Sequence, residues 1–222
     1  MAQQDVRYYL NGMLFEVTAG RLRTVATDGH RLAMCDADTQ TDSGERMQVI
    51  VPRKGVQELA RLLNDDDGIV TITLGNNHIR ATVGTVTFTS KLIDGKFPDY
   101  ERVLPKGGDK IVLANREELR HSLTRAAILS NEKFRGIRLQ LTPDMLRIQA
   151  NNPDQEEAED DLTVEYNGAS LEIGFNVQYL MDVLGVLDNT TAKFTLGDSN
   201  SSALVQDAEG GSSVYVVMPM RL

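Results

Sequence analysis

Short runs in which apolar and polar residues alternate occur in both halves of the chain. Gly, Asn and Asp residues separate many of these runs, which are VTITL at 70–74, HIRATV at 78–83, VTFTSKLI at 86–93, LRIQA at 146–150, LTVEY at 162–166 and VYVVM at 214–218. A period of two places successive side chains on opposite faces of a strand. The pattern therefore predicts antiparallel strands with one buried face.

Other stretches have the helical period instead. Two apolar stripes follow the spacing i, i+3, i+4, i+7, namely Val56, Leu59, Ala60 and Leu63, and Leu180, Val183, Leu184 and Leu187. This spacing places each stripe on one helix face. A third helix is expected after Asn115, a plausible N-cap with Glu118 three residues on and apolar residues at 119, 123, 126 and 127.

An internal repeat organises these elements. GMLFEVTAGRLRTVATD from Gly12 aligns with GIRLQLTPDMLRIQANN from Gly136, a shift of 124 positions that also superimposes the two apolar stripes. Each copy is much longer than a solenoid or propeller repeat and should have its own core. We therefore predict an α+β protein of two repeated domains, with antiparallel sheets and amphipathic helices. The breakers in LPKGGDK place the boundary between residues 1–107 and 108–222.

The two copies differ at their beginnings. The second opens with KIVLANREELRHSLTRAAIL, a strand followed by a helix, whereas the shift of 124 places Met1 opposite Arg125. We expect the first domain to lack its opening strand and most of its first helix, and the chain to start inside a domain.

Composition narrows the function. The net charge is -9, and several acids cluster between residues 154 and 165. The total charge argues against a surface that coats nucleic acid everywhere, although a local basic face remains compatible with it. The acidic cluster is typical of a solvated edge strand or loop, or of a face for a basic partner. No targeting segment or long apolar run is present, so we expect a cytoplasmic protein without a membrane role.

Candidate chemistry is sparse. Asp28, Gly29 and His30 are compatible with a hydrolytic enzyme in which the carboxylate orients the imidazole, but also with a turn. Cys35 is the one cysteine and has no nucleophile motif beside it. No spacing indicates a metal site, and we expect no cofactor.

Local groups of cations could meet a polyanion. The candidates are Arg53, Lys54 and Arg61 on the first predicted helix, and Lys133 and Arg135 in a loop of the second domain. Such a diffuse face suits phosphate attraction without reading of bases. A protein-interaction module without a DNA role is the alternative.

Four segments in order, TVATDGHRLAM at 24–34, KFPDYERVLP at 96–105, SNEKFRG at 130–136 and the terminal YVVMPMRL, resemble the bacterial DNA sliding clamp, the beta subunit of DNA polymerase III. The resemblance implies a non-catalytic processivity factor with three similar domains per subunit, in which two subunits form a head-to-tail ring around duplex DNA. This sequence resembles the middle and C-terminal domains.

The resemblance also implies a groove between these domains that docks clamp-binding peptides of DNA polymerases, the clamp loader and repair proteins. Its apolar subsite corresponds to Leu10, Thr27, Gly29, His30, Arg31, Leu32, Pro98, Arg102, Val103, Val216 and Met218. Its glutamine subsite corresponds to His30, Asn176, Tyr179, Met218, Pro219, Met220 and Arg221, with Tyr8, Tyr9 and Phe134 alongside. Asn200 departs from the family, which often has an apolar residue there. The apolar terminal run fits a contact surface, because Met side chains adapt to partners of different shape.

By the same resemblance, Ile128, Leu129, Glu157 and Asp160 belong to one half of the subunit contact. The other half lies on the family's first domain, which these 222 residues do not resemble. We therefore expect this chain to be mainly monomeric and to bind duplex DNA weakly and non-specifically.

Overall fold

The computed structural model describes residues 1–41, 44–63 and 68–221, so Leu222 of the terminal motif lies outside the described residues. The chain divides into two compact units, unit 1 at Met1–Tyr100 and unit 2 at Glu101–Leu222. The expected boundary after Gly107 lies in the segment of unit 2 before its first strand. No helix in the described part of the chain has the length and apolar character needed to cross a membrane.

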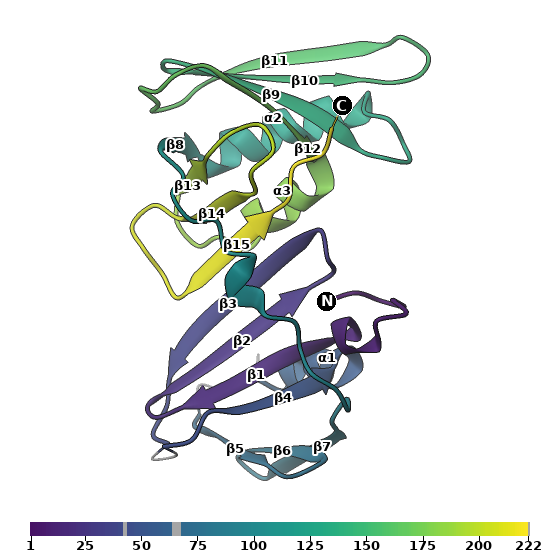
Figure 1. Ribbon diagram of the computed structural model, residues 1–222, viewed down its shortest axis with the longest axis vertical. Coiled ribbons are helices and arrows are strands. Elements are labelled where there is room, and N and C mark those ends of the chain that lie inside the picture. Colours follow the sequence, from purple (N-terminus) through teal and green to yellow (C-terminus); the bar gives the residue numbers. More distant parts are fainter. Residues whose placement is uncertain (42–43, 64–67, 222) are drawn as a thin grey trace. The chain divides into compact units, whose positions relative to one another are not determined.

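The main sheet of unit 1 is antiparallel, with strand order β4-β1-β2-β3 (Figure 1). Its strands are β1 (Gly12–Thr18), β2 (Arg21–Thr27), β3 (Arg31–Asp38) and β4 (Met47–Pro52). Leu14 pairs with Val25 on one side and with Ile50 on the other, and all three are buried on one face. Phe15 points to the opposite face, where it joins an apolar cluster separate from these three residues.

That cluster fills the space around helix α1 (Arg53–Leu63). A smaller antiparallel sheet packs there, with strands β5 (Val70–Leu74), β6 (His78–Val83) and β7 (Val86–Lys91) in sequence order. Leu59 of α1, Val51 of β4 and Ile79 of β6 belong to the one cluster. Two short 3-10 helices, η1 (Tyr8–Asn11) and η2 (Tyr100–Arg102), lie before β1 and after the small sheet in the sequence.

In unit 2, helices lie between two antiparallel sheets (Figure 1). One sheet has the order β11-β10-β9-β12, with β9 (Gly136–Thr142), β10 (Met145–Asn151), β11 (Glu157–Thr163) and β12 (Leu171–Asn176). In the other, β15-β14-β13-β8, the strands are β8 (Lys110–Asn115), β13 (Thr191–Leu196), β14 (Ala203–Asp207) and β15 (Ser213–Val217). The helices are α2 (Arg116–Ile128) and α3 (Val177–Leu184), and both sheets contribute to one core.

The predicted α+β class and the repeat are confirmed. β1 and β9 begin and end 124 positions apart, as do β2 and β10. Asn115 caps α2, since its side chain accepts hydrogen bonds from the backbone N–H groups of Glu117 and Glu118, both at 3.1 Å. Among the described residues of unit 1, no strand or helix corresponds to β8 and α2.

Three details of the predicted pattern were wrong. The strand expected at 162–166 is Glu157–Thr163, because it pairs along the full length of β10. Helix α3 ends at Leu184, so Leu187 is buried beyond the helix. Ala60 and Leu63 of α1 are exposed, since the apolar cluster reaches the helix through Leu59 and Val56. Periodicity located these three elements but did not fix which of their positions the neighbouring elements cover.

Candidate docking site

The turn between β2 and β3 carries the first group of candidate residues. The Thr27 hydroxyl donates to the carbonyl of Arg31 at 2.7 Å and accepts from the N–H of Gly29 at 3.1 Å. Asp28 accepts from the N–H groups of His30 and Arg31, both at 3.0 Å. Gly29 has a φ of 89°, a left-handed conformation that favours glycine. Local side chains thus fix the turn and leave His30 exposed.

Asp28 belongs structurally to this turn. Burial raises the pKa of the Asp28 carboxyl, but hydrogen bonds from the N–H of His30 and from Arg31 together lower it by more. The pKa of Asp28 therefore lies below its usual range. The Arg31 guanidinium also donates to the carboxylate, at 3.0 Å. These contacts favour the turn interpretation over the hydrolytic one.

The segment around η1 lies beside this turn. A Cβ added to Gly29 would be 3.1 Å from the Arg7 guanidinium, and one added to Gly95 would be 3.4 Å from the Tyr8 ring. The Tyr8 and Tyr9 rings meet edge to face, with centroids 5.8 Å apart. The structure therefore brings η1, the β2–β3 turn and the segment before Pro98 together within unit 1.

The candidates of unit 1 differ in exposure, with Tyr9, Thr27, Gly29 and Arg31 half-buried. Leu10 and Leu32 are buried, with exposed fractions of 2% and 4%. Tyr8, His30 and Pro98 are exposed. The buried pair therefore supports the surface, and the exposed side chains are the ones available for direct contact.

In unit 2, Asn176 joins three segments. Its side chain caps α3 by accepting from the N–H of Gln178 at 2.9 Å, and donates to the carbonyl of Phe134 at 3.1 Å. Close by in β12, the carbonyl of Gly174 accepts from the N–H of Met220 at 2.9 Å. The loop before β9, the start of α3 and the C-terminal segment thus come together.

The C-terminal segment itself is apolar and half-buried at Met218, Pro219 and Met220, while Arg221 is exposed. Val216, two residues earlier, is fully buried in β15. Tyr179 of α3 packs against the core of unit 2. The candidate residues of this unit therefore form a half-buried apolar surface with a polar cap at Asn176.

Arg102 and Val103 line a pocket of ≈ 610 Å³ within unit 2. Sequence reasoning missed the other residues that line this pocket, which are Leu104, Pro105, Lys106, Gly107, Gly108, Gly197, Asp198, Ser201 and Ser202. Asp198 organises one wall, because its carboxylate accepts from the Ser201 hydroxyl at 2.8 Å and from the N–H of Asn200 at 2.9 Å. The Gly-Asp-Ser-Asn-Ser composition signals a turn but gives no sign of what it faces.

The candidate DNA-facing cations are distributed over both units. In unit 1, Arg53 and Lys54 begin α1, and Arg61 near its end pairs with Glu58 at 2.9 Å. In unit 2, Lys133 lies 5.3 Å from the centre of the Phe134 ring. Arg135 is exposed and has a positive φ of 51°.

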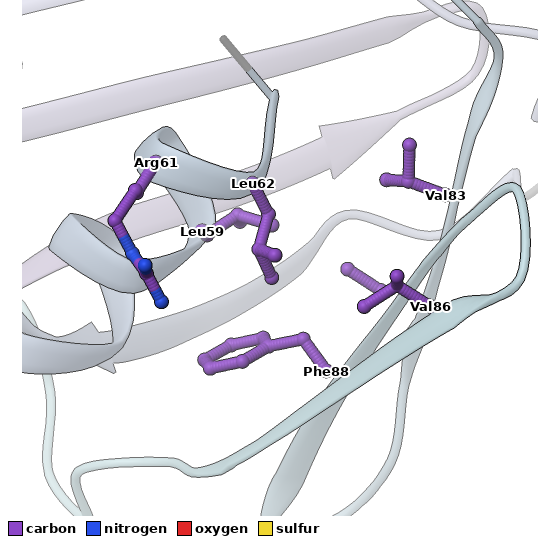
Figure 2. A pocket seen from close by; sticks show the side chains of 7 residues that line it. Leu59, Arg61, Leu62, Val83, Val86 and Phe88 are labelled. Carbon is purple, nitrogen blue, oxygen red and sulfur yellow. The ribbon is translucent and has the colours of Figure 1, made fainter. Parts of the chain in front are cut away.

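A pocket of ≈ 300 Å³ separates the end of α1 from β6 and β7 (Figure 2). Leu59 and Leu62 project from the helix toward Phe88, with Val83 and Val86 on the other rim (Figure 2). Among the described residues, its lining is apolar apart from Arg61 at the margin.

The candidate subunit contact lies at the end of α2 and along β11. Ile128 is 75% exposed, and Leu129 is half-buried. Among the described residues, β11 is an edge of its sheet, and its Glu157 is exposed. Asp160 on the same strand accepts from Arg125 of α2 at 2.9 Å. No group of acidic, histidine or cysteine side chains in the described ranges is arranged to hold a metal ion.

Comparison with known families assigns each unit. Residues 1–99 match the central domain of the DNA polymerase III beta subunit, and residues 101–221 match its C-terminal domain. The two units are therefore repeated domains of the clamp class.

Individual relatives agree. The chain is 68% identical to the beta sliding clamp of Pseudomonas aeruginosa and 57% identical to that of Escherichia coli K12, over all 222 residues and 60% of each relative. A crystal structure of the P. aeruginosa clamp bound to griselimycin matches with a TM-score of 0.97 at 68% identity, covering all of this chain and 60% of that one. A Caulobacter crescentus beta structure matches at 0.92 and 36%, covering all of this chain and 61% of that one. The chain belongs to the DNA polymerase III beta subunit family, the beta sliding clamps, and spans about 60% of the length of these relatives.

Proposed function

We propose that this chain serves in a sliding clamp as the part that docks clamp-binding peptides of DNA polymerases, the clamp loader and repair proteins. The observation that carries the proposal is the C-terminal segment Met218–Met220. It is apolar, remains half-exposed and is fixed by the hydrogen bond from Met220 to Gly174. An ordered apolar segment that stays half-exposed suits a partner, because exposed apolar surface often marks an interaction site.

The chemistry of the candidate residues fits a peptide of the form Gln-Leu-x-Leu-Phe. Its leucine and phenylalanine would bury apolar surface against Pro98, Val103 and Met218, which contributes about 25 cal/mol per Å² before ordering costs. Its glutamine would be oriented by hydrogen bonds near Asn176. Because ordering a flexible peptide offsets much of the gain, we expect a dissociation constant on the order of micromolar.

The same proposal gives the chain a non-catalytic role on DNA in the bacterial cytoplasm. Its candidate cations attract phosphates without reading bases, which suits sliding. In this proposal a closed ring, and not affinity, retains the duplex. Ile128, Leu129, Glu157 and Asp160 are then part of the contact that closes the ring with another clamp domain.

Calorimetry with the synthetic peptide tests docking. We expect one site per chain, and at least a tenfold weaker affinity for the double variant Met218→Ala, Met220→Ala, because two apolar contacts of about 1 kcal/mol each are lost. The matched control is Val186→Ala, which shortens an apolar side chain that is 57% exposed and lies outside the candidate site. Equal peptide affinity in the double variant and the control, with both folded, would place the site elsewhere.

A further inference from the structure

A row of polar side chains crosses one face of the main sheet of unit 1. Glu16 on β1 pairs in register with Gln48 on β4 and with Arg23 on β2, and Arg23 pairs with Asp36 on β3. The Gln48 amide donates to Glu16 at 2.6 Å, and the Arg23 guanidinium makes a two-pronged ion pair with Asp36. Leu14, two residues before Glu16, is buried on the same face.

The Tyr100 side chain covers this row and contacts two of its members. Its hydroxyl donates to the Glu16 carboxylate at 3.2 Å and accepts from the Arg23 guanidinium at 3.4 Å. Glu16 also accepts from Arg46 at 2.6 Å, and its side chain is only 3% exposed. Several donors thus offset the cost of burying the Glu16 carboxylate. One of them, the Tyr100 hydroxyl, lies 84 positions away in the sequence.

The second repeat contains the same row at a more exposed place. Gln140 pairs with Glu172 and with Arg147, and Arg147 makes a two-pronged ion pair with Asp161. The Gln140 amide donates to Glu172, so the amide and the carboxylate have exchanged strands. Here the Arg147 and Asp161 side chains are 35% and 44% exposed, compared with 15% and 35% for Arg23 and Asp36 in unit 1. The row of unit 2 is therefore more open to solvent than the row of unit 1.

The segment that ends at Tyr100 also contains Pro98, a candidate docking residue. Ile93 bridges to Ile50 on β4, after which the segment passes over the sheet to Tyr100 at β1 and β2. Phe97 and Tyr100 are buried, with exposed fractions of 6% and 2%, whereas Pro98 between them is exposed. Two buried aromatic side chains thus hold a short exposed turn.

We propose that Tyr100, acting through Glu16 and Arg23, is a positioning residue that fixes Pro98 for peptide docking. The inference rests on the proposed docking function and deepens it. Tyr100 makes its hydroxyl contacts within unit 1 and need not touch the peptide. Removing the Tyr100 hydroxyl leaves the ring in its packed place. The effect of the hydroxyl contacts on Pro98 can therefore be measured separately from the packing of the ring.

The test uses Tyr100→Phe, with Asp36→Asn as a second variant that weakens the hold on Arg23. Asp161→Asn is the matched control, because it removes the same charge from the corresponding row of unit 2. Hydrogen–deuterium exchange of residues 96–101 reports anchoring, and calorimetry with Gln-Leu-x-Leu-Phe reports docking. We expect faster exchange and a roughly three- to tenfold loss of peptide affinity in the first two variants, and neither effect in the control.

The two readouts separate the possible failures. An unaltered chain that binds no peptide overturns the proposed function, whatever the exchange result. If the unaltered chain binds, unchanged exchange in Tyr100→Phe overturns the anchoring. Faster exchange with unchanged affinity overturns the link between Tyr100 and docking, and so does an equal affinity loss in Asp161→Asn.

Discussion

Among the described residues, the acids Glu16 and Asp207 are buried, and each has a different kind of hydrogen-bond partner. Asp207 accepts from backbone N–H groups of Asp188 and Asn189, which holds the loop after α3. Glu16 depends on side chains. Burial raises its pKa, but hydrogen bonds from Arg46, Gln48 and Tyr100 outweigh burial, so its pKa lies below the usual range.

This lowered pKa predicts a pH dependence of stability. A carboxyl whose pKa is lower in the folded than in the unfolded state stabilises the fold above its unfolded pKa of about 4.3. The contribution is lost as pH falls through the folded pKa. We expect Glu16→Gln to reduce the free energy of unfolding by about 1–3 kcal/mol at pH 7. Urea titrations should show a smaller difference near pH 3, and an equal difference at both pH values would contradict the assignment.

At the residue scale, local chemistry was predictable and distant partners were not. The sequence Asp28-Gly29-His30 indicates a turn, and the carboxylate contacts lie within three residues. Glu16 gave one weak signal, a charge inside the apolar run GMLFEV. Its partners Arg46, Gln48 and Tyr100 are 30, 32 and 84 positions away, so no local pattern identifies them.

Among the elements, α2 and α3 both start with an asparagine cap after a strand. Asn115 and Asn176 each accept a hydrogen bond from a backbone N–H two residues on. Only Asn176 also donates to the carbonyl of Phe134 and belongs to the candidate docking site. The two caps therefore allow helix stability and docking to be separated.

We expect Asn115→Ala to destabilise unit 2 by about 1 kcal/mol, because a helix N-cap is lost. Its peptide affinity should be unchanged. Asn176→Ala should cause a similar or larger destabilisation and also weaken peptide binding. Thermal unfolding and calorimetry on the same samples measure both effects. Equal peptide affinities in the two variants would remove Asn176 from the docking site.

Element positions followed from the sequence better than element ends did. Alternation located β5, β6 and β10 because their outer faces are solvated. Helix α3 ends at its C-cap Gly185, whose N–H still makes a helical bond to the Met181 carbonyl, whereas the N–H of Val186 bonds to Val183, only three residues back. Leu187 is nevertheless buried, through tertiary packing and not through a place on the helix face as its spacing had suggested.

At the scale of the whole molecule, the net charge of -9 opposes nucleic acid binding, and only local cations favour it. We expect weak, sequence-independent DNA binding that falls steeply between about 50 and 200 mM salt. The triple variant Arg53→Ala, Lys54→Ala, Arg135→Ala should weaken it further and flatten the salt dependence. Fluorescence anisotropy with two unrelated duplexes measures these effects.

The matched control removes three positive charges at positions outside the candidate DNA face, in Arg80→Ala, Lys91→Ala, Lys193→Ala. If both triple variants weaken DNA binding equally, total charge and not a defined face is responsible. Selective binding of one duplex at physiological salt would contradict the proposed sliding role.

The duplication was readable from the sequence because whole strands keep their length and spacing. Residues of the candidate docking site were not, since they come from short segments at 8–10, 27–32, 98–103, 134, 176–179 and 216–221 with no shared local pattern. Resemblance to a known family supplied them. The pocket walls at Gly197–Ser202 and the tyrosine cover at Tyr100 required coordinates.

The difference in exposure between the two rows has a consequence for how the two copies can diverge. In unit 1, a change at Glu16 or Arg23 disturbs a buried network that also involves Tyr100. In unit 2, Gln140 and Arg147 lie where solvent can replace a lost partner. We therefore expect two positions that began as copies of each other to tolerate substitution unequally. The exposed copy should accept single changes, whereas the buried copy should accept them only together with changes in its partners.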